Sequence, residues 1–136
     1  HVITEMFTKY TPSFACSATD QYRLLNTWAT DHMTMILLNG GYSETLHIII
    51  KLFDSDENPY PHSHFNEGID SLNGALTCVG IVLPEKIYLG SAEMRNTKTY
   101  NSNMETSSIL INEEWVQFTE FEFLLMEELN KYGLAK

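Results

Sequence analysis

The sequence predicts an α+β fold in a single domain, residues 1–136, with a mainly antiparallel sheet of about four to six strands. Three observations favour it. The length of 136 residues is close to the usual size of one domain. A hydrophobic fraction of 43% is enough to build a core. Helix-like and strand-like patterns alternate, so a long helix in the N-terminal half and a C-terminal helix are expected to pack on the sheet.

The first long pattern is helical. Residues 1–5 are expected to be a disordered or vector-derived start before Met6. A helix is predicted over residues 20–38, ending at Asn39 and two glycines. Its apolar side recurs at three- and four-residue steps: Tyr22, Leu25, Ala29, Met33 and Ile36. Leu24, Trp28 and Met35 form a second apolar strip, which predicts that the helix is covered on two sides.

The middle of the chain is predicted to be mainly strand and loop. Residues 45–53 are rich in isoleucine and predict an interior strand. Residues 54–64 carry Asp, Asn and two prolines and predict a surface loop. A short helix is expected over 66–76, followed by a hairpin of strands 78–83 and 86–91 around Pro84. Residues 95–107 are almost all polar and predict a long loop.

The end of the chain has the clearest local signals. Short strands are predicted at 109–111 and 115–118. Thr119 and Glu122 have the spacing of a capping box, which marks the start of a helix. Phe118 and Phe123 stand where a hydrophobic staple belongs. The expected core stripe of this helix follows the helical spacing: Phe121, Leu125, Leu129 and Tyr132.

Composition argues against several classes of protein. Eighteen Asp and Glu against eight Lys and Arg give a net charge of −10, which repels nucleic-acid phosphates and anionic lipid. No apolar run approaches the roughly 18 residues of a membrane-spanning helix. Cys16 and Cys78 lack CxxC spacing and are predicted to be buried free thiols, with a disulfide between them as the alternative. The chain has no Asn-x-Ser/Thr acceptor for N-glycosylation, which argues against a secreted protein. We therefore expect a soluble, cytoplasmic protein.

Motifs for catalysis are scarce. The sequence has no Gly-x-Ser-x-Gly elbow and no glycine-rich phosphate loop at the start of a helix. One cluster has metal-ligand spacing: His62, His64 and Glu67. Two imidazoles and a carboxylate suit a divalent metal, so a small metal-dependent enzyme or metal-binding protein is one interpretation. Two exposed loop histidines without a ligand are the other.

The charge distribution carries the main functional prediction. From Thr99 to Asn130 the chain has no Lys or Arg but seven glutamates. Such a surface either keeps the protein soluble or docks on a basic partner. We expect the second: a non-enzymatic inhibitor, immunity protein or viral or mobile-element accessory factor, without a cofactor. The residues expected to meet the basic protein partner are Glu113, Glu114, Glu120 and Glu127.

Self-association is a further expectation from the last helix. Phe123, Leu124 and Met126 are predicted to lie off its core stripe, which favours a homodimer contact through this helix. On its outer face, Lys131 is expected to be the counter-charge of Glu127 at the four-residue spacing.

Overall fold

The computed structural model describes residues 1–12, 19–31, 33, 35–68, 70, 74–95, 102–103 and 105–133. In these residues the chain forms five α-helices and two small antiparallel sheets, one of two strands and one of three. The α+β class predicted from the sequence is confirmed. The prediction of one sheet with four to six strands is wrong, because the strands divide into two separate sheets.

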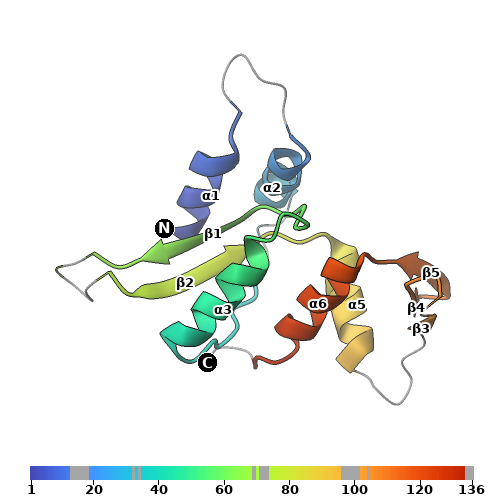
Figure 1. The fold of residues 1–136 in the computed structure, drawn as a ribbon. Coiled ribbons are helices and arrows are strands. Elements are labelled where there is room, and N and C mark those ends of the chain that lie inside the picture. The colour runs from blue at the N-terminus through green and yellow to red at the C-terminus, as the bar shows by residue number, and fades with distance from the viewer. Residues whose placement is uncertain are drawn as a thin grey trace.

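In the described residues three helices come first, followed by two strands, one helix, three short strands and a last helix (Figure 1). In chain order they are α1 (Val2–Tyr10), α2 (Asp20–Asp31), α3 (Ser43–Phe53), β1 (His62–Asn66), β2 (Leu76–Ile81), α5 (Glu85–Arg95), β3 (Ser102–Asn103), β4 (Ser108–Ile111), β5 (Glu114–Gln117) and α6 (Glu120–Leu129). Helix α1 packs on the β1–β2 hairpin from one side and α3 packs on β2, while α5 contacts both α6 and β4.

Two hydrophobic clusters hold these elements together. The larger one joins α3, α5, α6 and the three-stranded sheet, and its fully buried side chains are Ile87, Ile109, Leu125 and Met126. The smaller one joins α1, α2 and the segment after β2 through Met6, Leu25, Trp28 and Val82. Leu24 packs against both clusters. Full burial of a large apolar side chain contributes roughly 1.5–3 kcal/mol, so these contacts dominate the stability of the fold.

The first residues belong to the core, contrary to the expectation of a disordered start. Residues Val2–Tyr10 form α1, and Met6 is buried. A Cβ on Gly80 of β2 would lie 2.5 Å from Val2 Cγ1 and 2.9 Å from Met6 Cε. The helix therefore rests directly on the hairpin backbone, and only glycine at position 80 leaves room for that approach.

Helix α2 is shorter than predicted. It ends at Asp31, and Met33 has a φ of +48°, outside the helical region. Leu25 and Trp28 are buried, but Met33 and Ile36, predicted to continue the apolar face, are more than half exposed. The helix stops where its side chains no longer have a core to pack against, because most helical stability comes from tertiary packing.

Residues 45–53 form a helix rather than the predicted strand. Leu46, Ile49, Ile50 and Phe53 are spaced i, i+3, i+4 and i+7, which places them on one helical face. Ile49 and Phe53 are buried in the main cluster. The isoleucine run favours a strand locally, but packing overrides a preference of a fraction of a kcal/mol per residue.

The predicted hairpin after residue 78 is also wrong in its second half. Strand β2 pairs antiparallel with β1, His62 opposite Ile81, so the loop predicted over 54–64 ends where β1 begins. Residues 86–91 lie in α5, and Pro84 precedes its first turn, where the missing amide hydrogen of proline is tolerated. Of the residues predicted to form a helix over 66–76, the first is the last residue of β1 and the last is the first residue of β2. Residues 69 and 71–73 lie outside the described part.

The C-terminal predictions are largely confirmed. The two strands expected near 109–111 and 115–118 are present as β4 and β5, which pair as an antiparallel hairpin, and β3 adds to β4 with Asn103 opposite Ser108. Much of the long loop predicted over 95–107 lies outside the described residues, but 102–103 form β3. Helix α6 begins at the predicted capping box. Met126, predicted to face outward, is fully buried, whereas Leu124 is 49% exposed.

A test of the α5–α6 contact is the substitution Gly90→Ala. A Cβ at this position would lie 2.6 Å from Met126 Sδ and 3.0 Å from Phe118 Cζ. We expect it to lower the free energy of unfolding by about 1–3 kcal/mol, measured by urea denaturation. Gly68→Ala is the control, because its Cβ would meet open space, and it should change stability by less than about 0.5 kcal/mol. Equal stability of the two variants would contradict the close packing of α5 on α6.

A second test concerns the turn between β4 and β5. Asn112 and Glu113 join the paired residues Ile111 and Glu114, with φ values of +49° and +68°, as in a type I′ turn. We expect Glu113→Gly to raise the free energy of unfolding by about 0.5 kcal/mol, because glycine adopts positive φ without strain. Glu114→Gly, inside β5, should lower it by about 0.5–1 kcal/mol. The opposite order in thermal or urea denaturation would rule out this turn geometry.

Candidate functional site

The start of α6 is fixed by the capping box. Thr119 Oγ1 accepts a hydrogen bond from the Glu122 amide at 3.1 Å, and Glu122 Oε1 accepts one from the Thr119 amide at 2.9 Å. The rings of Phe118 and Phe123 contact each other edge to face with centroids 5.7 Å apart, as the predicted hydrophobic staple requires. Because the first turn is fixed in this way, Glu120 is held in an exposed position at the N-terminal end of the helix.

Glu122 is a buried carboxylate that joins three parts of the chain. It is 3% exposed. The hydroxyl of Tyr60, in the segment before β1, donates a hydrogen bond to Oε2. Nζ of Lys86, from α5, lies 2.9 Å from Oε2 and 3.2 Å from Oε1. The ammonium of Lys86 also stands 5.2 Å from the centre of the Phe118 ring. Hydrogen-bond donors thus surround the carboxylate where the core shields it from water.

These contacts change the pKa values of the groups involved. Burial alone would raise the pKa of Glu122, but hydrogen bonds from Tyr60, the Thr119 amide and Lys86, with the charge of Lys86, lower it overall. Burial and the bond to Glu122 raise the pKa of Tyr60. Glu122 is therefore ionised and Tyr60 is protonated at neutral pH.

The last turn of α6 has a second, smaller network. Lys131 Nζ lies 2.8 Å from Glu128 Oε2, and the Tyr132 hydroxyl donates to Glu128 Oε1 at 2.6 Å. These bonds lower the pKa of Glu128 overall, against the effect of burial, while burial and the same carboxylate raise that of Tyr132 to about 12. Lys131 forms its ion pair with Glu128, three residues earlier, and the expected interaction with Glu127 is a weaker electrostatic one without an ion pair.

The four predicted docking residues remain exposed, in two groups. Glu120 and Glu127 lie seven residues apart on α6, hence on one face and about 10 Å apart along the axis. Glu113 and Glu114 lie at the β4–β5 turn, at the far end of β5 from α6 (Figure 1). Within the described residues, the ion pairs of Lys and Arg involve other carboxylates: Asp20, Glu122 and Glu128.

A third exposed feature was not predicted. The segment between α2 and α3 and the outer side of α3 expose large apolar side chains: Met33, Met35, Ile36, Leu37, Leu38, Tyr42 and Ile48. Most of them follow one another closely along the chain, and exposed apolar side chains that form one patch are typical of protein contacts. The sequence signal was present, because the apolar run 35–38 directly precedes Asn39 and two glycines, but we assigned it to the predicted helix.

Of the two histidines in the predicted metal site, His62 has other partners. His62 Nε2 lies 3.1 Å from Asp54 Oδ1, and its Nδ1 lies 3.0–3.2 Å from Tyr60 O, the Tyr10 hydroxyl and Asn58 Nδ2. His64 follows two residues later on β1 and is exposed. Glu67 accepts a hydrogen bond from the Thr77 hydroxyl at 3.1 Å. Among the described residues, no three His, Cys, Asp or Glu side chains are grouped so that they could hold a metal ion.

Cys78 is an exposed free thiol on β2, so the prediction of a buried thiol is wrong for this residue. Cys16 lies outside the described residues. None of the described helices is long and apolar enough to cross a membrane.

Comparisons with known proteins add no relative. No protein family, no curated protein and no solved structure matches this chain.

The buried Glu122 should make stability depend on pH. Its pKa is lowered in the folded state, so the stability that its ionised form contributes is complete above the unfolded value of 4.5 and is lost as the pH falls through the folded value. We expect Glu122→Gln to lower the free energy of unfolding at pH 7 by about 2–4 kcal/mol, because Lys86 loses its partner. It should also flatten the fall in stability between about pH 5 and pH 3.

The matched control is Glu120→Gln in the same helical turn. Its carboxylate is exposed, so the change at pH 7 should stay below about 0.5 kcal/mol. Urea denaturation at a series of pH values measures both variants. If the stability of the Glu122→Gln protein fell with pH as steeply as that of the parent, Glu122 would not be the source of the pH dependence.

Proposed function

We propose that this chain is a non-enzymatic interaction protein, of the inhibitor, immunity or accessory-factor kind, whose acidic C-terminal third binds a basic surface of another protein. The observation that carries the proposal is the way charges are divided around α6. Lys86 and Lys131 pair with Glu122 and Glu128. The exposed carboxylates nearby are left without such a partner among the described residues.

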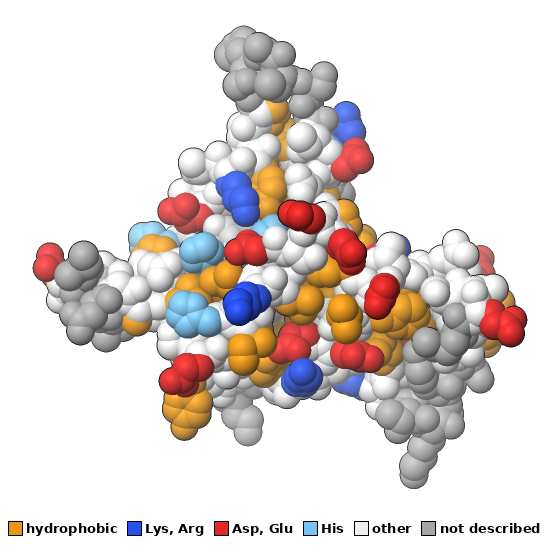
Figure 2. All heavy atoms as spheres, in the orientation of Figure 1, with side chains coloured by type: hydrophobic (Ala, Val, Ile, Leu, Met, Phe, Trp, Pro, Cys, Tyr) orange, Lys and Arg blue, Asp and Glu red, His pale blue; other side chains and the backbone are white. Residues whose placement is uncertain are grey.

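Electrostatics explains what such a surface does. Uncompensated carboxylates together with a net charge of −10 raise the association rate with a basic protein and repel acidic ones. In Figure 2, Asp and Glu side chains lie scattered over the face shown, with few Lys and Arg between them. Docking on a basic patch needs no further rearrangement of α6, because its capping box and staple already hold the helix.

The exposed apolar side chains between α2 and α3 support the same class of function. A protein that binds other proteins gains affinity from apolar contacts and selectivity from charge. A homodimer through α6 has less support than the sequence suggested. Phe123 packs against the main cluster and Met126 is buried, so Leu124 is the exposed member of that group.

Charge reversal tests the proposal. The double variant Glu120→Lys, Glu127→Lys should weaken binding to the basic partner by about tenfold or more, mainly through a slower association rate. Glu44→Lys, Glu57→Lys is the matched control. It changes the net charge by the same amount at exposed sites on and after α3 and should change the affinity far less.

The partner itself is obtained by affinity capture from the native host at low and at raised salt. We expect capture of a basic protein that the parent chain retains at low salt and releases at raised salt. The α6 variant should fail to retain this protein. Equal capture by the α6 variant and the control variant would contradict docking through α6. A partner that is acidic or insensitive to salt would contradict the proposal as a whole.

A further inference from the structure

The three-stranded sheet has an outer face with its own chemistry, separate from the acidic surface. Side chains alternate between the two faces of a strand, and directly paired residues share a face. Ile109, Ile111 and Val116 form the inner face and pack in the main cluster. The outer face carries the row Asn103, Ser108 and Gln117 across β3, β4 and β5, and beside it the pair Leu110 and Trp115.

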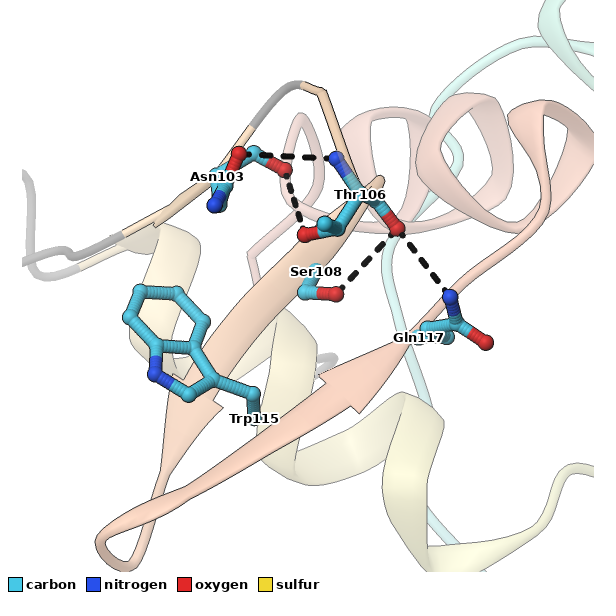
Figure 3. Close-up of a pocket in the computed structure, with 5 residues that line it drawn as sticks. All are labelled: Asn103, Thr106, Ser108, Trp115 and Gln117. Carbon is cyan, nitrogen blue, oxygen red and sulfur yellow. Dashed lines mark hydrogen bonds between the residues drawn. The ribbon is translucent and has the colours of Figure 1, made fainter.

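This outer face holds an open groove of about 580 Å³, which is nearer to a flat surface than to an enclosed cavity. Its lining residues are Asn103, Thr106, Ser108, Trp115 and Gln117. Figure 3 shows the indole of Trp115 at one end of the groove and the amide and hydroxyl groups along the rest. None of the described residues that line it is charged.

Trp115 lies on the outer face of the sheet, where it pairs with Leu110 across the strands and stays about half exposed. Its side chain is 55% exposed, on the side of β5 away from the core. A large aromatic ring left in water loses the roughly 2–3 kcal/mol that its burial would contribute. Exposed tryptophans with neighbouring polar groups are typical of binding sites, because the ring offers a flat apolar face with an N–H at its edge.

Part of the hydrogen-bonding capacity of the groove is used internally. Asn103 Oδ1 accepts from the amides of Glu105 and Thr106 at 3.0 and 3.4 Å. Ser108 Oγ and Gln117 Nε2 both donate to Thr106 O, at 3.2 and 3.4 Å. Within the described residues, these bonds leave the Asn103 amide nitrogen as a donor and the Gln117 carbonyl as an acceptor.

We propose that this groove binds a neutral carbohydrate. A sugar ring stacks the C–H groups of one face on the indole of Trp115, whose ring face is electron-rich. Its hydroxyls, each both donor and acceptor, bond to the amides of Asn103 and Gln117. The absence of charge among the described lining residues, together with the net charge of −10, disfavours phosphorylated or acidic sugars. An extended peptide has less reason to bind here, because it would pair with the backbone at a sheet edge rather than lie on a face.

The test follows the two indole N–H signals of the protein in 1H–15N NMR spectra, since Trp28 and Trp115 are its two tryptophans. Trp115→Phe assigns them. The probes are hexasaccharides of β-1,4-glucose, α-1,4-glucose, β-1,4-mannose and β-1,4-N-acetylglucosamine, each up to about 10 mM, the range of weak binding. We expect at least one probe to shift the Trp115 signal in a saturable way while the buried Trp28 signal stays in place.

Variants separate the groove from the rest of the surface. Trp115→Ala should weaken binding of the active probe at least tenfold, and Gln117→Ala about threefold or more. Leu124→Ala, which removes a comparably exposed apolar side chain from α6, should leave binding unchanged. Circular dichroism and urea denaturation of each variant check that it is folded.

Three results would overturn the inference. One is the absence of any shift of the Trp115 signal with all four neutral probes. Another is a stronger response to hexagalacturonate than to the neutral sugars. The third is a response to hexalysine alone, which would make Trp115 part of the surface that binds a basic protein. None of these depends on capture of the basic partner, so the two proposals fail separately.

Discussion

The buried carboxylate of Glu122 is the contact on which the C-terminal half of the structure depends. It completes the capping box of α6, pairs with Lys86 of α5 and accepts a hydrogen bond from the hydroxyl of Tyr60, in the segment before β1. An ionised group at 3% exposure is tolerated only when donors surround it, because an unpaired buried charge costs several kcal/mol. The same contact therefore sets the start of α6, its distance from α5 and the position of the chain entering β1.

This arrangement also determines which charges reach the surface. The two lysines nearest to α6 in the described structure are paired with carboxylates that are buried or half-buried. The glutamates at the outer positions of α6 and at the β4–β5 turn face solvent. Internal pairing that stabilises the fold thus leaves an acidic exterior, so stability and the proposed docking surface share one physical origin. A surface that only keeps the protein soluble would expose the same glutamates. Binding to a basic protein distinguishes a docking surface from such a solvated surface.

The structure presents three surfaces of different chemistry. The acidic residues of the C-terminal third suit a basic protein, and the apolar side chains between α2 and α3 suit a contact that excludes water. The outer face of the β3–β4–β5 sheet combines an exposed indole with neutral amides and hydroxyls. The apolar side chains lie on other elements, whereas Glu113 and Glu114 of the acidic surface belong to the same β4–β5 hairpin as Trp115.

The sequence by itself determined the features that depend on neighbouring residues. The capping box, the staple and the two short strands β4 and β5 were predicted because their signals lie within a few positions of one another. The exposure of the four glutamates followed from charge alone. The alternation of Trp115 and Gln117 with Val116 was also visible, but the sequence does not say that Trp115 lies in a groove.

Only the tertiary structure decided the features that depend on distant residues. The isoleucines of α3 form a helix because the main cluster accepts one helical face, and α2 ends where no core covers its next turn. The pairing of Glu122 with Lys86 joins residues 36 positions apart, and that with Tyr60 joins residues 62 apart. Local preference differs between helix and strand by less than a kcal/mol per residue, whereas burial contributes several times more, so packing decides wherever the two disagree.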